Sequence, residues 1–349
     1  MELDAKQLYQ KRKMRLAIFG LIIAFAAAVA NTVFQNFNVA ASGIAGEKFT
    51  DSLLATYVLS VLLIAVGEII GGIIMILFNR AKGTPVSEFG RALRVKSSRM
   101  ILISAILGGP IGTACTVMAV SLCGSTYANC IVGLVPAITC VLGAVFLKEK
   151  TGARVWIGVA LCTIGVIIAA VSPPEGVTNF YLGIGIACIA PIAFAIENII
   201  STHAVDVVDP MVACPLYRML GSACIELIIV VVLCAATGNL CWIADAFSVI
   251  CSSPLCILFI LCMSVFMCIQ YNGTYTGYTY CGAIKASAIL WTGTFWTIPV
   301  GFAMSAMNIL DYNVTAMGIA GAIVVVAGIM LVIAKPSELF SLRSTGGEK

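Results

Sequence analysis

Long apolar runs, almost free of charged residues, divide this chain of 349 residues. Ten such runs cover residues 15–39, 53–78, 100–122, 125–147, 153–171, 180–201, 211–236, 254–271, 284–306 and 314–334. A bilayer core about 30 Å thick needs roughly 20 helical residues, so each run is a candidate spanning helix. Barrel strands would alternate apolar and polar residues, and these runs are continuous. The sequence predicts an all-α integral membrane protein with ten transmembrane helices.

The charge pattern predicts how the chain is oriented in the membrane. Charged residues make up 10% of the sequence, against about 25% in soluble proteins. If the N-terminus is cytoplasmic, 17 of the 20 Lys and Arg residues fall on that side, and Lys48 lies outside. We therefore expect a multi-pass plasma (inner) membrane protein with both termini cytoplasmic. The net charge of +4 reflects contact with the lipid bilayer, and no nucleic acid partner is expected.

The sequence has no pattern that is typical of a cleavable signal peptide, a metal site or a disulfide framework. The first run follows several basic residues and is too long for a signal peptide, so it is interpreted as an anchor. The chain has 15 cysteines, mostly within the runs and never spaced as CxxC, and a single histidine, His203. No metal and no cofactor are therefore expected.

The sequence resembles itself at a shift of 163 residues. This shift places Pro136 on Pro299, Gly158 on Gly321 and Gly165 on Gly328 without a gap. We infer two copies of one unit at 15–173 and 174–336, with cytoplasmic tails at 1–14 and 337–349. Five spans per unit is an odd number, so the second copy enters the membrane from the opposite side. Inverted repeats of this kind are typical of alternating-access carriers, although a merely larger bundle is the alternative.

Prolines within the runs are candidate hinges. Pro136 and Pro299 occupy matched positions, and Pro110 lies between glycines in the third run. Each proline removes one helical hydrogen bond, so we expect a kink or a weak point there. A hinge and a static kink remain equal alternatives.

A proline placed before a polar break and a glycine-containing helix gives the chain a recognisable signature. Pro136, Glu149, Gly158 and Gly165 form this pattern, which resembles the EamA family of the drug/metabolite transporter superfamily. The resemblance implies a ten-helix carrier whose cavity is lined mainly by helices one, three, four, six, eight and nine. Known substrates of such carriers range from amines and amino acids to nucleotide sugars. The second copy departs from the pattern, because Tyr312 stands where Glu149 would be.

Charged residues inside the runs are functional candidates, because a charge at a helix centre costs about 2.5–3.5 kcal/mol. Four qualify, namely Glu68, Glu197, Arg218 and Glu226. Glu197 is the first choice for binding a substrate or a coupling proton. Arg218 could instead hold Glu197, or Glu68, in a structural or gating ion pair. Glu226 has no evident partner in the sequence and ranks lower.

Polar and aromatic residues in the other runs are candidate ligands. Asn31 and Gln35 share one helical face, and the repeat shift places Gln35 on Asn198. Gln270, Tyr271, Trp291 and Trp296 complete the predicted substrate-binding set. Aromatic rings beside a glutamate favour an organic cation or a zwitterion, although core packing explains these rings as well. Tyr275 and Tyr278 are interpreted as residues of the interfacial belt.

These observations favour a secondary carrier for a small polar metabolite such as an amine or an amino acid, coupled to a proton or a counter-substrate. Lys285 suggests an alternative, because its place resembles a lysine that meets the anionic group in phosphate-sugar and nucleotide-sugar carriers. A channel or an intramembrane enzyme is a further class. No catalytic cluster is evident, so we expect no enzymatic activity. Monomer and homodimer both remain open.

Overall fold

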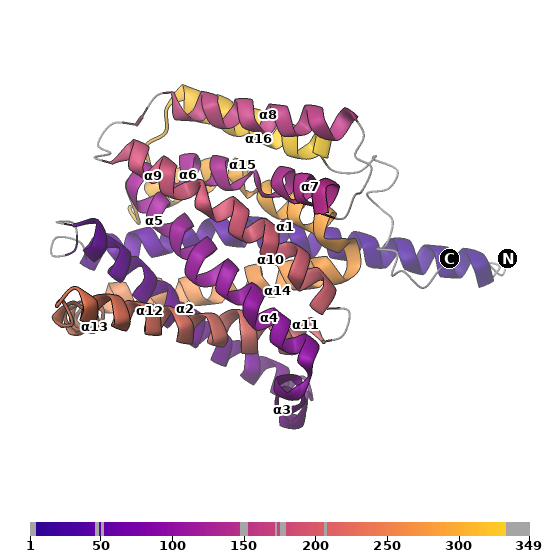
Figure 1. Ribbon diagram of the computed structural model, residues 1–349, viewed down its shortest axis with the longest axis horizontal. Coiled ribbons are helices and arrows are strands. Elements are labelled where there is room, and N and C mark those ends of the chain that lie inside the picture. The colour runs from indigo at the N-terminus through magenta and orange to yellow at the C-terminus, as the bar shows by residue number, and fades with distance from the viewer. Residues whose placement is uncertain are drawn as a thin grey trace.

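The computed structural model describes residues 5–45, 49, 52–146, 153–171, 173–174, 179–205 and 208–332. These residues form helices joined by short connections, with no strand among them. Most helices run along the long axis of the molecule and pack side by side as a bundle (Figure 1). The predicted all-helical class is confirmed for the described ranges.

Sixteen α-helices and two π-helical segments follow one another along the described chain. Their order is α1 (Ala5–Ala45), α2 (Leu53–Ala81), α3 (Val86–Arg94), α4 (Lys96–Ile106), η2 (Leu107–Thr113), α5 (Ala114–Cys123), α6 (Ser125–Val132), α7 (Val135–Phe146), α8 (Ala153–Ala170), α9 (Phe180–Ala187), α10 (Ile189–Ala204), α11 (Pro210–Ala213), η3 (Cys214–Gly221), α12 (Ser222–Ala236), α13 (Cys241–Ser252), α14 (Pro254–Trp291), α15 (Gly293–Ala306) and α16 (Ala316–Val332).

Eight helical stretches among the described residues are long and apolar enough to cross a membrane. They are Lys11–Ile44, Leu53–Ala81, Met100–Cys123, Ser125–Leu142, Ala153–Ala170, Phe180–Thr202, Pro210–Ala236 and Pro254–Gly282. Each coincides with one of the first eight predicted runs. The last two predicted runs correspond to shorter helices, α15 with 14 residues and α16 with 17. Ten crossings therefore remain a prediction.

The predicted end of the eighth run at 271 is wrong, because the helix continues to Gly282. The ninth run was expected to begin at 284, and α14 does resume its helical course after Gly282, up to Trp291. It bends at Gly282, whose φ of 80° is accessible to glycine at little cost. Polar residues such as Thr274 suggest a loop in the sequence, but the side chain of Thr274 is buried inside the bundle. Helices α3 and α13 also lie outside the predicted runs.

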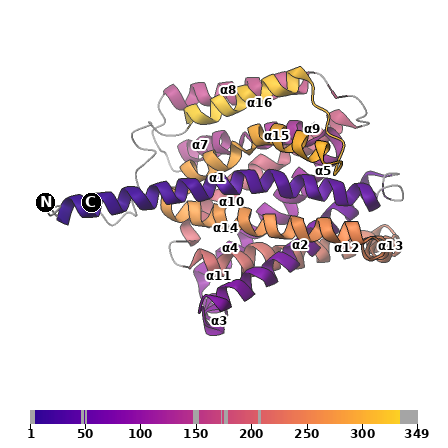
Figure 2. The same cartoon turned by 180° about the vertical axis from the view of Figure 1, so that it is seen from behind.

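Helices α8 and α16 pack backbone against backbone at one edge of the bundle (Figures 1 and 2). A Cβ added to Gly165 would lie 2.8 Å from the carbonyl oxygen of Gly321, and one added to Gly158 would lie 2.8 Å from that of Gly328. The contacts run in opposite order along the two helices, so the pair is antiparallel. Small residues permit this approach, as is usual for helices in membranes.

Prolines interrupt some helices and leave others intact. Pro136 follows a break at residues 133–134 between α6 and α7, and Pro110 lies within the π-helical segment η2. Pro299, in contrast, lies inside the continuous helix α15. Pro136 thus adjoins a break and Pro299 does not, and the matched kinks or hinges at these two prolines stay a prediction. Glu149, residues 1–4 of the predicted N-terminal tail and the predicted C-terminal tail at 337–349 lie outside the described residues, whereas residues 5–14 belong to α1.

Candidate functional site

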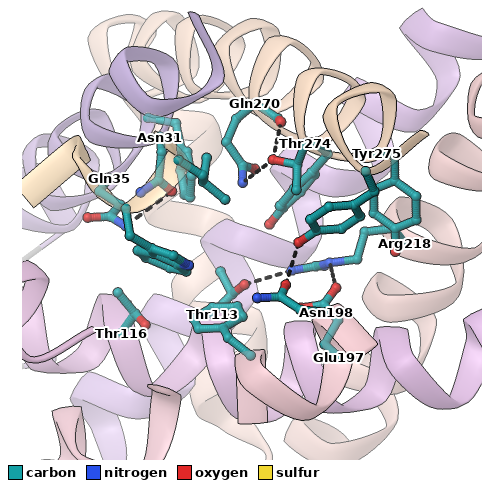
Figure 3. Close-up of a pocket in the computed structure, with 16 residues that line it drawn as sticks. Asn31, Gln35, Thr113, Thr116, Glu197, Asn198, Arg218, Gln270, Thr274 and Tyr275 are labelled. Atoms are coloured by element: carbon teal, nitrogen blue, oxygen red, sulfur yellow. Dashed lines mark hydrogen bonds and ion pairs between the residues drawn. The ribbon is translucent and has the colours of Figure 1, made fainter. Parts of the chain in front are cut away.

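A small cavity of about 30 Å³ lies at the centre of the bundle (Figure 3). Its walls combine amides, hydroxyls, aromatic rings and one ion pair, contributed by α1, η2, α5, α10, η3 and α14. The lining residues are Asn31, Phe34, Gln35, Thr113, Thr116, Phe194, Glu197, Asn198, Arg218, Gln270, Tyr271, Thr274, Tyr275, Tyr278, Leu290 and Trp291.

Most of the residues predicted from the sequence meet at this cavity. Seven of the predicted substrate ligands line it together with Arg218, and they are Asn31, Gln35, Glu197, Asn198, Gln270, Tyr271 and Trp291. Glu68 lies behind the wall, where it contacts Arg218. Residues that lie far apart in the sequence thus meet at one site, on helices from both halves of the chain.

Trp296 and Lys285 lie apart from this site. Trp296 belongs to an outward-facing apolar groove, where its ring packs edge-on against Phe25 at 5.2 Å between centroids. Trp291 ends α14, whereas Trp296 lies in α15, beyond the break at Thr292. Lys285 is absent from the cavity wall. This conformation therefore places neither residue where a substrate in the cavity would touch it.

Arg218 holds the charged side of the cavity together. Its Nε lies 3.1 Å from Oε1 of Glu197, and its Nη1 lies 2.9 Å from Oε1 of Glu68. Nη2 donates a hydrogen bond of 2.8 Å to the hydroxyl of Thr113. The guanidinium carbon also lies 4.2 Å from the centre of the Tyr271 ring, within the range of a cation–π contact. Both proposed partners of Arg218 are thus engaged at once.

The two π-helical segments position this ion pair. Thr113 is the last residue of η2, and Arg218 lies within η3, so their hydrogen bond joins the two segments. Each segment contains a proline, Pro110 or Pro215, which cannot donate a backbone hydrogen bond. Widened turns of this kind are rare and occur often at functional sites.

Glycines in η2 make room for the carboxylate of Glu197. A Cβ added to Gly108 would lie 2.0 Å from Oε2 of Glu197, so a side chain there would displace the glutamate. Glu197 thus reaches Arg218 because the facing helix has no side chain at this position.

We expect Gly108→Ala to destabilise the folded protein by about 1–3 kcal/mol, because the added methyl group overpacks the site and pushes Glu197 away from Arg218. Thermal unfolding of the purified protein in detergent measures the loss. Gly185→Ala is the matched control, since nothing lies within 4 Å of a Cβ at that position. Equal unfolding temperatures for the two variants would contradict the contact.

An uncharged cluster forms another part of the cavity wall. Asn129 of α6 donates a hydrogen bond of 2.7 Å to Oε1 of Gln35, whose own amide lies 3.4 Å from Oδ1 of Asn31. On α10, Asn198 accepts a hydrogen bond from Tyr278 and donates one of 3.1 Å to Ser287. The cavity therefore combines a charged region at Arg218 with neutral amides elsewhere.

Two polar atoms at the cavity have no hydrogen-bond partner in the described protein. They are Nε1 of Trp291, a donor, and Oε1 of Gln270, an acceptor. Buried polar atoms without partners are uncommon and costly in folded proteins. A bound solute with both an acceptor and a donor would satisfy them.

The sequence missed several residues of this wall. Tyr275 and Tyr278 were interpreted as interfacial, whereas both are buried and line the cavity. They follow Tyr271 at i+4 and i+7, a spacing that puts all three on one helical face. The predicted end of the eighth run at 271 concealed this pattern. Arg218 also brings the seventh predicted run into the wall, although the family resemblance favours other helices.

The comparisons with known proteins agree with this architecture. Residues 14–171 match the model of the EamA-like transporter family. A crystal structure of a protein with 13% sequence identity superposes with a TM-score of 0.53, covering 88% of this chain and 95% of the other. At that identity, the likeness concerns the fold alone. No curated protein matches the chain. Residues 14–171 of this integral membrane protein are therefore similar to the EamA-like transporter family, which confirms the resemblance found in the sequence.

Proposed function

We propose that this protein is a secondary carrier, which moves a small polar metabolite across the membrane by alternating access. The observation that carries this proposal is the polar cavity, whose walls come from both halves of the chain. Helices α1 and α5 and segment η2 belong to the first half, and α10, η3 and α14 belong to the second. Carriers built from two repeats hold their substrate in such a position.

The size of the cavity supports a cycle of opening and closing. A volume of about 30 Å³ has room for about two or three water molecules, which need about 10–15 Å³ each. A metabolite is larger, so helices must separate before it can enter. The break before Pro136 and the π-helical segment around Pro110 are the places where we expect the helices to bend.

The contact between α8 and α16 supports two inverted copies. The shift of 163 residues relates Gly158 to Gly321 and Gly165 to Gly328. In the structure, Gly158 packs against Gly328, and Gly165 packs against Gly321. Cys162 even contacts its own mate, because its Sγ lies 3.6 Å from the carbonyl oxygen of Val325. Reciprocal contacts of this kind are typical of a two-fold axis. A two-fold axis that exchanges two antiparallel helices is perpendicular to both helices. Because the helices cross the membrane, this axis lies in the membrane plane.

The chemistry of the wall favours an amine or an amino acid as the substrate. The rings of Tyr275, Tyr278 and Trp291 surround the cavity, and the carboxylate of Glu197 reaches it. Aromatic faces and a carboxylate suit an ammonium group. Lys285 does not line the cavity, so the alternative of phosphorylated sugars gains no support from this arrangement.

Counterflow in proteoliposomes tests the carrier function. Thermal shifts of the purified protein with amines, amino acids, nucleosides and sugar phosphates first identify a ligand, because a ligand stabilises the state that it binds. Vesicles preloaded with the unlabelled ligand should then take up labelled ligand faster than empty vesicles. A channel gives no such acceleration, so equal rates with and without preloading would refute the proposal.

A further inference from the structure

The charges buried at the centre of the bundle do not balance. Arg218, Glu68, Glu197 and Glu226 expose 1%, 0%, 6% and 0% of their surfaces, respectively. Three ionised carboxylates beside one guanidinium would leave two uncompensated negative charges in a low-dielectric interior. A buried ion without a partner is so costly that it usually becomes neutral by taking up a proton. Protons must therefore reside on this cluster.

Glu226 is the carboxyl that Arg218 does not reach directly. Its Oε1 accepts a hydrogen bond of 3.3 Å from the hydroxyl of Ser222, and that hydroxyl lies 3.5 Å from Nη1 of Arg218. Its Oε2 has no hydrogen-bond partner in the described protein. Glu68 and Glu197 both contact the guanidinium, so Glu226 gains least from being charged.

Among the described residues, Glu68 and Tyr57 of α2, Tyr271 of α14 and Arg218 of η3 influence Glu226 electrostatically. Of these four side chains, only that of Arg218 is cationic. A negative Glu68 nearby opposes a second negative charge at Glu226. This arrangement favours a neutral Glu226 for as long as Arg218 remains paired with the other two carboxylates.

Gly109 brings the bridge between these residues into contact with η2. A Cβ added to Gly109 would lie 1.6 Å from the hydroxyl oxygen of Ser222 and 3.2 Å from Oε1 of Glu226. The hydroxyl is therefore held against the backbone of a π-helical segment, next to Gly108, where Glu197 is seated. A movement of η2 would disturb the Glu197 contact and the Ser222 bridge together.

We propose that Glu226 is a proton-binding site of this protein, which Ser222 and Arg218 connect to the central cavity. The inference rests on the proposed carrier function, and it moves the coupling proton from Glu197 to a residue behind the cavity wall. When the Arg218–Glu197 contact opens, the guanidinium is free to turn toward Glu226. The carboxylic acid then loses its proton to a water molecule, forming a carboxylate and a hydronium ion, and the carboxylate is stabilised by Arg218.

Infrared spectroscopy of the full chain in lipid vesicles at neutral pH tests the proposal without any substrate. A protonated carboxyl has a C=O stretching band that an ionised one lacks. Glu226→Gln should remove a component of this band, and Ser222→Ala should shift the same component, because it removes the hydrogen bond to Oε1. Glu197→Gln should retain this component. A band unchanged by Glu226→Gln, or a component lost in Glu197→Gln alone, would overturn the assignment.

A transport measurement separates proton coupling from a structural role. We expect Glu226→Gln to lose uptake driven by a pH gradient, relative to counterflow of the same ligand in the same vesicles. A merely structural substitution would lower both rates together, which would overturn the coupling role. An absence of counterflow in the wild-type protein would refute the proposed carrier function. The infrared measurement would still decide whether Glu226 holds a proton. Gel filtration and circular dichroism confirm that each variant is folded.

Discussion

Arg218→Met is expected to destabilise the folded protein by about 3–5 kcal/mol, the usual effect of removing one partner from a buried ion pair. The substitution keeps the length of the side chain but removes the charge that Glu68 and Glu197 share. Both carboxylates would then remain buried beside an apolar neighbour. Oε1 of Glu197 would also lose its hydrogen bond from Arg218, and Oε1 of Glu68 would keep only the one from the hydroxyl of Tyr271.

The matched control removes the carboxylates as well. In the triple variant Arg218→Met, Glu68→Gln, Glu197→Gln, no charge is left without a partner among these three positions. Replacing a whole buried ion pair by neutral residues is often close to neutral for stability. We therefore expect the triple variant to regain most of the stability lost by Arg218→Met. Thermal unfolding in detergent, followed by gel filtration, compares the two proteins.

The same comparison distinguishes structure from function. The triple variant should fold, yet its counterflow should be lost, because Glu197 and Arg218 both line the cavity. If Arg218→Met were as stable as the wild type, the ion pair would contribute nothing to the fold. That outcome would contradict the burial of all three side chains.

The length of the apolar runs predicted the helices well because the membrane leaves the backbone few alternatives. A chain in hydrocarbon must satisfy its hydrogen bonds internally, so long apolar runs become helices regardless of detail. The first eight runs are helical for this reason, and their centres were predicted correctly. Polar residues were less informative. Thr274 and Tyr275 resemble a loop in the sequence but lie on a buried helical face.

Residues of the candidate site could be predicted where their spacing in the sequence puts them on one face of a regular α-helix. Asn31 and Gln35 are four positions apart, and both reach the cavity from α1. The sequence gives no such rule for π-helical segments, which change the direction of every side chain after them. Arg218 lies within such a segment, so its simultaneous contacts with Glu68 and Glu197 could not be deduced. These contacts depend on how three helices pack.

The packing of α8 against α16 carries the second large expected effect. Gly158→Leu and Gly321→Leu should each destabilise the protein by about 3 kcal/mol or more, at the upper end for overpacking. A Cβ at Gly158 would lie 2.8 Å from the carbonyl oxygen of Gly328, and one at Gly321 would lie 2.6 Å from that of Gly165. A backbone carbonyl cannot turn aside as a flexible side chain can, so the two helices must separate.

The proposed symmetry of the two halves also predicts how the losses of stability at the two glycines compare with each other. The shift of 163 residues relates Gly158 to Gly321, so a two-fold axis between α8 and α16 requires similar losses at the two positions. Gly185→Leu is the control, because nothing lies within 4 Å of a Cβ there. Thermal unfolding temperatures of the three variants provide the comparison. A large loss at one glycine and none at its mate would mean that the two halves do not pack as equivalent copies. The inverted arrangement on which alternating access depends would then lose its structural support.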